Sequence, residues 1–162
     1  MTHVMNAESS LKPTDLRGIL KYVPQFRGHV FVIALDGSII DHDNFANVVT
    51  DIAVLKSLNI KLVLTHGIGC QLRAIAEESG QKISNEYGNG PTDEVTMNMA
   101  ISASAKARQR LIEALSAAGL KCASTNAVRG AERSIVKGKS WGLTGQPTNI
   151  DTDFINNLIE ND

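Results

Sequence analysis

The chain has 162 residues, enough for one domain with a substantial core, and 43% of them are hydrophobic. With 16 basic and 17 acidic residues, it lacks the excess of positive charge that nucleic-acid binding requires. No apolar run approaches the roughly 20 residues of a membrane span, and the polar start MTHVMNAESS has no secretory h-region, so we expect a cytoplasmic protein.

The N-terminal part predicts a lead-in, a helix and a buried strand. Residues 1–12 are expected to form a flexible lead-in. A helix should begin at residue 13, with its apolar residues on one face, and Pro24 should end it. Residues 29–35 form an apolar run, which predicts a strand buried on both faces, as in a parallel sheet.

A sharp turn at Asp36 and Gly37 follows this strand, and a helix is expected after it. Proteins of the α/β class often bind anionic ligands at such turns, because backbone N–H groups there are free to donate. Asp41 and Asp43 are suited to cap the helix, whose apolar residues recur at helical spacing over 45–55. The turn carries an aspartate and no lysine. The turn alone therefore does not decide whether this is a phosphate site or only the backbone shape of one.

A second strand and helix complete the first half. Asn59 occupies a position where a left-handed backbone should end the preceding helix. The run IKLVLTHG, residues 60–67, predicts a second buried strand, and a short helix around 72–76 should be closed by Gly80. The order strand, helix, strand, helix predicts a parallel sheet with crossover helices.

The second half mixes a long helix with short strands. The turn-rich run 81–93 predicts a short strand or hairpin, and a long helix should follow over 93–118. LKCAST, residues 120–125, predicts a third short strand, and 131–145 predicts a β-hairpin. A last amphipathic helix should begin at the cap residue Asp151. We therefore expect an α/β fold, with three α/β/α layers and a mainly parallel sheet.

These landmarks resemble the amino-acid kinase family, above all N-acetylglutamate kinase and the kinase-like domain of N-acetylglutamate synthase. The likeness is carried by FVIALDGSI, DIAVLKSLNIKLVLTHG, TDE and LTGQPTNIDTDFINNLIEND, in that order. It spans about residues 14–162 and covers only the N-terminal part of the family's domain. The resemblance implies that residues 13–162 form a partial domain that ends before the ATP-binding half.

The first strand departs from the kinase pattern. Family kinases have a lysine where this chain has Ala34 and a glycine where it has Asp36, while Gly37 is kept. Phosphoryl transfer depends on positioning and on cations that neutralise charge. A carboxylate about 4 Å from a phosphate oxygen costs on the order of 4 kcal/mol at an effective dielectric near 20. Kinase activity is therefore disfavoured.

The second glycine turn and the start of the long helix keep more of the family pattern. Family kinases have His-Gly-Gly-Gly-Pro after the second strand, and this chain keeps the histidine and the first and third glycines as His66, Gly67 and Gly69. Two glycines at the start of a helix can bind a carboxylate. Plain loop geometry, a hydrogen-bonded histidine at a strand end and helix capping explain the same residues as well. The candidate residues for binding substrate or effector are Gly37, His66, Gly67, Ile68, Gly69, Thr92 and Asp93.

Two functions of different classes stay open. The resemblance to the synthase implies a non-catalytic assembly and sensing domain in arginine biosynthesis, binding arginine, glutamate or N-acetylglutamate. It would form a homo-oligomer through residues 14–24 or meet a partner that completes its sheet. The alternative is a kinase of the N-acetylglutamate kinase type, which needs ATP and magnesium and phosphorylates the acyl-amino-acid carboxylate. A degenerate fragment without a selected function is a third possibility.

No cofactor or metal follows from the sequence. Cys70 and Cys122 stand alone, without a CxxC motif or a Cys/His cluster that would suggest zinc. They are expected to be reduced thiols in or near the core.

Overall fold

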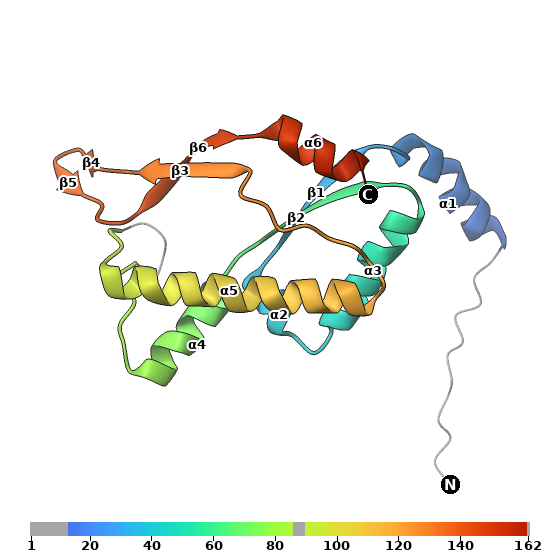
Figure 1. The fold of residues 1–162 in the computed structure, drawn as a ribbon. Coiled ribbons are helices and arrows are strands. Elements are labelled where there is room, and N and C mark those ends of the chain that lie inside the picture. The colour runs from blue at the N-terminus through green and yellow to red at the C-terminus, as the bar shows by residue number, and fades with distance from the viewer. Residues whose placement is uncertain (1–12, 86–89, 162) are drawn as a thin grey trace, which may run out of the picture.

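The computed structural model describes residues 13–85 and 90–161, so the predicted lead-in and part of the turn-rich run lie outside the described residues (Figure 1). In chain order the elements are α1 (Pro13–Phe26), β1 (Val30–Leu35), α2 (Gly37–Asp41), α3 (Phe45–Ser57), β2 (Lys61–His66), α4 (Gly69–Ser79), α5 (Glu94–Ala117), β3 (Val128–Glu132), β4 (Ile135–Val136), β5 (Lys139–Ser140), β6 (Gly145–Ile150) and α6 (Thr152–Glu160). The α/β class is thereby confirmed. None of the described helices is long and apolar enough to cross a membrane.

The parallel pair predicted for the first half is present. β1 and β2 run parallel, with Val30 opposite Lys61 and Leu35 opposite His66. Their carboxyl ends therefore lie at the same edge of the sheet, and the two glycine turns follow there. Among the described strands, only β1 and β2 pair in parallel, and one isolated parallel bridge joins Thr92 to Gly142. β3 pairs with β6 and β4 with β5 in antiparallel fashion.

The hydrophobic core lies between one face of this sheet and helices α2, α3 and α5. Its buried residues are Leu35, Ile40, Phe45, Val49, Ile52, Ala107, Leu111 and Leu115. Side chains alternate along β1, so Ile33 and Leu35 face the core while Val32 is 68% exposed. The prediction that this strand is buried on both faces is therefore wrong.

Local signals set several helix ends as predicted. The Asp93 carboxylate accepts a hydrogen bond from the Thr96 N–H at 2.7 Å and caps α5. Asp151 caps α6 in the same way. Asn59, with φ 60°, and Gly80, with φ 66°, take the left-handed conformation at the ends of α3 and α4.

Two helix boundaries differ from expectation. α1 continues past Pro24 to Phe26, because a proline in the last turn removes only one backbone hydrogen bond. Neither Asp41 nor Asp43 caps α3; the cap position belongs to Asn44, which makes no side-chain capping bond. Asp41 instead ends α2, where its carboxylate bonds to residues of α4 and α5.

The strand predicted at LKCAST is absent, and residues 120–127 form an irregular segment. A strand requires a hydrogen-bonded neighbour, and a cavity separates this segment from β2. The strand predicted within 81–93 is also absent from the described residues of that run, 81–85 and 90–93, where Thr92 forms only an isolated bridge to Gly142. The hairpin over 131–145 is confirmed by β4 and β5, whereas β6 was not predicted.

Candidate functional site

The two glycine turns pack directly against each other at the carboxyl ends of β1 and β2. A Cβ atom added to Gly37 would lie 2.9 Å from the Gly67 carbonyl oxygen, so the backbones approach as closely as only glycine allows. The buried Gln71 side chain donates from Nε2 to the Gly37 carbonyl and to an Asp41 carboxylate oxygen, each at 2.7 Å. The structure thus brings together the glycine turns that the sequence separates.

Asp36 caps its own helix. Its carboxylate accepts hydrogen bonds from the Ser38 hydroxyl at 2.7 Å and from the Ser38 N–H at 2.8 Å. These two bonds, the hydroxyl first, hold the pKa of Asp36 below its usual value; burial opposes them, and the charge of Arg73 lowers the pKa by less than burial raises it. A carboxylate therefore already occupies the position at the start of α2 that a bound anion would take.

The Arg73 guanidinium lies beside the loop that follows β2. Gly69 begins α4 behind Ile68, which makes no side-chain cap bond. A Cβ atom at Gly69 would lie 3.7 Å from Arg73 Nη1, so the guanidinium lies over the loop. His66 contacts the Gly67 carbonyl oxygen through Nδ1 at 3.3 Å. The groups near the carboxyl end of β2 that could contact a ligand are therefore the glycine backbone, the His66 imidazole and the Arg73 guanidinium.

Sequence reasoning missed Arg73 and Gln71. Both follow the second glycine turn on α4, and side chains of a helix lean toward its N-terminus, where this turn lies. An arginine four positions after Gly69 was thus a usable signal for a cation at the loop. The role of Gln71 carried no such signal, because Gly37 and Asp41 lie about thirty residues earlier in the chain.

Thr92 and Asp93 attach the hairpin to α5. The Thr92 hydroxyl lies 2.9 Å from that of Thr144, its N–H donates to the Trp141 carbonyl at 3.2 Å, and its own carbonyl accepts from Leu143 at 2.8 Å. Asp93 caps α5, which lowers its pKa. The hydrogen bonds of this pair thus go to the hairpin, to α5 and to neighbouring loop residues rather than to the glycine turns.

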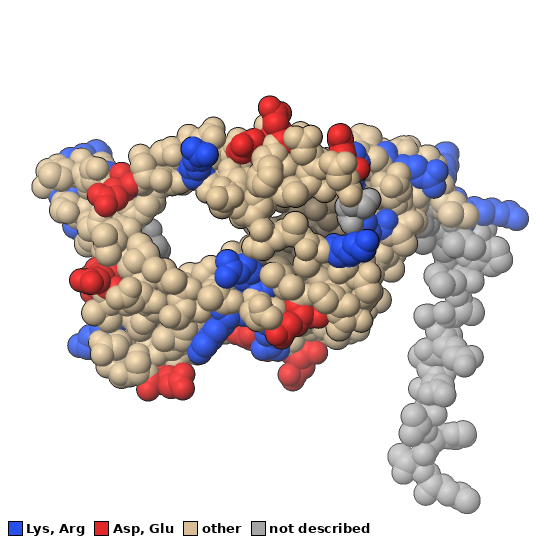
Figure 2. Space-filling view, viewed as in Figure 1, with Lys and Arg blue, Asp and Glu red and all other residues tan. Residues whose placement is uncertain are grey.

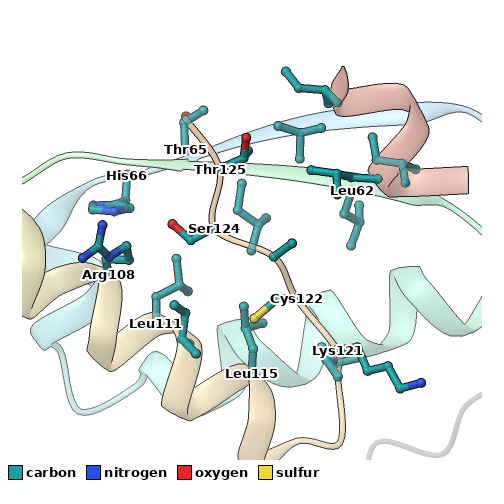
Figure 3. A pocket seen from close by; sticks show the side chains of 18 of the residues that line it. Leu62, Thr65, His66, Arg108, Leu111, Leu115, Lys121, Cys122, Ser124 and Thr125 are labelled. Atoms are coloured by element: carbon teal, nitrogen blue, oxygen red, sulfur yellow. The ribbon is translucent and has the colours of Figure 1, made fainter. Parts of the chain in front are cut away.

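A cavity of 560 Å³ lies between β2, α5, α6 and the irregular segment 120–125. His66, Arg108, Ser124 and Thr125 line its polar end, and leucines and isoleucines line its body (Figure 3). On the surface, the molecule is hollowed between α5 and the β3–β6 ribbon with α6, and acidic and basic side chains are interspersed over that face (Figure 2).

The thiols do not form a metal site. Cys70 is half-buried and Cys122 is exposed, and both are free, so the expectation that Cys122 lies in or near the core is wrong. Cys122 is exposed because it belongs to the irregular segment rather than to a strand within a sheet. Among the described residues, no group of three or more His, Cys, Asp or Glu side chains is arranged to hold a metal ion.

Comparison with known proteins identifies the family. The model of the amino acid kinase family matches residues 29–162, most of the chain. This chain belongs to the amino acid kinase family. It is 30% identical over 154 residues to the amino-acid acetyltransferase of Pseudomonas fluorescens strain Pf-5, a match that covers 90% of this chain and 36% of that protein. The amino-acid acetyltransferase of Vibrio cholerae is 28% identical over 165 residues, covering 96% of this chain and 37% of the relative.

Solved structures of N-acetylglutamate synthase share the fold of this chain. N-acetylglutamate synthase from Neisseria gonorrhoeae, complexed with coenzyme A and N-acetyl-glutamate, matches with a TM-score of 0.79 and 25% identity, over 90% of this chain and 34% of that one. The same enzyme with coenzyme A and L-arginine matches with a TM-score of 0.76 and 24% identity, over 90% and 36%. This amino acid kinase family chain thus spans about a third of the length of the relatives it matches.

Proposed function

We propose that this chain is a regulatory and assembly domain of the N-acetylglutamate synthase type, acting in arginine biosynthesis and transferring no phosphoryl group by itself. The observation that carries the proposal is Asp36, whose carboxylate occupies the start of α2 in a site without the kinase lysine. An aspartate carboxylate is charged near neutral pH, and the two hydrogen bonds from Ser38 hold it at the start of α2, so it repels a phosphate there. Ala34 supplies no compensating charge.

The proposed ligand is an amino acid with a free carboxylate: arginine, glutamate or N-acetylglutamate. The turn formed by His66, Gly67, Ile68 and Gly69 leads into the start of α4, where backbone N–H groups can bind an anion, and Arg73 lies beside Gly69. The Gly67 N–H itself donates to the Leu35 carbonyl, so the N–H groups that follow it are the ones we assign to the ligand. A carboxylate is small enough for such a turn and pairs well with a guanidinium. Under this proposal, Gly37 shapes the site through its close contact with Gly67. Thr92 and Asp93 act by holding α5 and the hairpin.

The proposed assembly surface is α1. Its side chains of Leu20, Tyr22 and Phe26 are 57%, 59% and 43% exposed. Large apolar side chains gathered on one exposed helix favour a contact with another subunit. We assign residues 14–24 to a homo-oligomer contact, and we expect the whole assembled domain to have three α/β/α layers around a longer parallel sheet. We further expect it to act in the cytoplasm.

The alternative function is a kinase of the N-acetylglutamate kinase type. It is favoured by the two glycine turns, which face each other where a phosphoryl group and an acceptor would meet. Under this alternative, ATP with magnesium is the phosphate donor, and the residues that bind ATP lie outside residues 13–162.

A thermal melt of the purified chain tests the proposal, alone and with L-arginine, L-glutamate, N-acetylglutamate or Mg-ATP. At about a hundred times its dissociation constant, a ligand adds about 2.7 kcal/mol to the free energy of unfolding, several degrees in Tm for this size. We expect an amino-acid ligand to raise Tm and Mg-ATP to leave it unchanged. Arg73→Met should remove the shift, whereas the matched surface change Arg129→Met on β3 should keep it.

Two results contradict the proposal. A Tm that none of the amino acids raises removes the sensing role. A shift with Mg-ATP, together with transfer of labelled phosphate to N-acetylglutamate, establishes the kinase alternative instead.

A further inference from the structure

The turn that leads into α4 lies between an acidic and a basic residue. A Cβ atom at Gly67 would lie 4.0 Å from the Asp36 Cα, whereas one at Gly69 would lie 3.7 Å from Arg73 Nη1 and 3.9 Å from Nη2. The two glycines are two positions apart in the chain, so their Cα atoms are at most about 7 Å apart. Asp36 and the Arg73 guanidinium therefore flank the same short stretch of backbone.

One oxygen of the Asp36 carboxylate is open to a ligand. The Ser38 N–H and the Ser38 hydroxyl both donate to Oδ1. In the part of the chain that the structure describes, no hydrogen bond or ion pair reaches Oδ2, and Asp36 is exposed. The charge of Arg73 acts on this carboxyl, yet the two side chains form no ion pair with each other. Two opposite charges are therefore close together but unpaired.

A buried acceptor lies against the same turn. Gln71 is 6% exposed, and its Oε1 has no hydrogen-bond partner among the described residues. This oxygen packs against Gly37, since a Cβ atom at Gly37 would overlap it. It is too deeply buried to touch a ligand, so it acts through its partial negative charge. Together with Asp36, it makes the Gly37 side of the turn favour a positively charged group.

The α4 side of the turn favours a negatively charged group. The first N–H groups of a helix have no partner within the helix, and Gly69 and Cys70 begin α4. A carboxylate placed there accepts from these N–H groups and pairs with the Arg73 guanidinium. The two sides together match a molecule that carries an ammonium and a carboxylate on one carbon atom, which is a free α-amino acid.

We propose that this site selects free α-amino acids over N-acylated ones, with Asp36 accepting a hydrogen bond from the α-ammonium group and Arg73 pairing with the α-carboxylate. Acylation turns the ammonium into a neutral amide, so it removes the positive charge that Asp36 attracts. Among the ligands proposed above, L-arginine and L-glutamate are therefore favoured over N-acetylglutamate. This inference rests on the proposed sensing function and makes Asp36 a specificity-determining residue.

The test measures dissociation constants by isothermal titration calorimetry on the unmodified chain, so it does not depend on the folding of a variant. A hydrogen bond between charged groups supports about a tenfold difference in Kd. L-glutamate should therefore bind about tenfold more tightly than N-acetyl-L-glutamate or glutarate. Glutarate lacks the amino group and adds no bulk, and N-methyl-L-glutamate keeps the charge and should bind nearly as tightly as L-glutamate. L-arginine and N-acetyl-L-arginine form a second matched pair.

Variants assign the preference to named residues. Asp36→Asn keeps an oxygen that accepts the Ser38 hydrogen bonds but removes the charge, so the preference for the free amino acid should disappear. Arg73→Met should weaken the binding of both members of each pair. Asp51→Asn, at an exposed position of α3, removes the same charge elsewhere and should keep the preference.

Three outcomes overturn the inference. N-acetylated ligands that bind as tightly as the free amino acids contradict it but leave the sensing function standing. A preference that survives Asp36→Asn also contradicts it, because another group then recognises the ammonium. If neither the free nor the N-acetylated amino acids bind the unmodified chain, the sensing function fails and the inference fails with it.

Discussion

The Gln71 side chain donates a hydrogen bond from Nε2 to the Gly37 carbonyl at 2.7 Å, which ties α4 to the turn at the end of β1. The two residues are 34 positions apart, and the amide is buried. The same Nε2 reaches Asp41 at the end of α2, so one side chain of α4 holds both ends of α2. The stability of the candidate site therefore depends on this amide and on the space that Gly37 leaves for it.

The first prediction concerns that space. Gly37→Ala should lower the free energy of unfolding by about 1–3 kcal/mol, because its Cβ would overlap Gln71 Oε1 and approach the Gly67 carbonyl. Urea unfolding at neutral pH measures the change. Gly18→Ala in α1 is the control, since nothing lies within 4 Å of the added methyl, and it should stabilise by up to about 1 kcal/mol. Equal stability of Gly37→Ala and the unmodified chain would contradict the close packing of the turns.

The second prediction separates the Gln71 amide from the ion pair beside it. Gln71→Ala should cost about 1–3 kcal/mol, because it leaves the buried Gly37 carbonyl without its donor. Arg110→Met breaks the 2.9 Å pair with Asp41, but the two side chains are 51% and 34% exposed, so the cost should be at most about 1 kcal/mol. The same denaturation assay compares the two variants. The reverse ranking would mean that the ion pair, rather than the amide, holds α2 in place.

The third prediction is a pH dependence from Asp93. The Thr96 hydroxyl and then the Thr96 N–H hold the pKa of this carboxyl below 3.8, so the folded chain binds fewer protons than the unfolded one in acid. Its contribution is complete above the unfolded pKa and is lost as the pH falls through the folded pKa. Asp93→Asn keeps a good helix cap but removes this titration.

The measurement is the free energy of unfolding at about pH 7 and at about pH 3. We expect the loss of stability between these values to be smaller in Asp93→Asn than in the unmodified chain. Asp36→Asn should behave in the same way, since Ser38 lowers the pKa of Asp36 through the same kind of bonds. A pH dependence identical in all three chains would show that other groups set it.

The fourth prediction concerns assembly through α1. Glutamate in place of Leu20 or Tyr22, which are both exposed, should shift the chain toward smaller species in sedimentation velocity, because it places charge in an apolar contact. Ala105→Glu, at an exposed position of α5 outside residues 14–24, adds the same charge and is the control. The assignment of α1 to assembly is wrong if the unmodified chain is a monomer across the concentration range.

Sequence patterns predicted the features that depend on neighbouring residues. Asn59 and Gly80 end their helices, and Asp93 and Asp151 begin theirs, because capping involves only a few adjacent backbone groups. The parallel pair and its glycine turns were predictable for the same reason, since the hydrophobic runs and turn residues are local signals.

Features that depend on distant contacts were missed. Asp41 has the chemistry of a cap, but its carboxylate bonds to Gln71 and Arg110, which only the packed helices bring near. LKCAST has the composition of a strand but no paired edge beside it. Within the candidate site, the glycine turns were predicted, whereas the cation Arg73 became evident only once α4 was in place.

The parallel pairing of β1 with β2 also has a consequence for the order of folding. Val30 pairs with Lys61, an offset of 61 − 30 = 31 residues, so the strand–helix–strand unit closes from a short stretch of chain. Leu111 and Leu115 of α5 pack against the same core residues, but the ribosome synthesises them much later. During synthesis from the N-terminus, the nascent unit therefore exposes Leu35 and Ile52 until α5 leaves the ribosome. In that interval these side chains are open to chaperones and to other nascent chains.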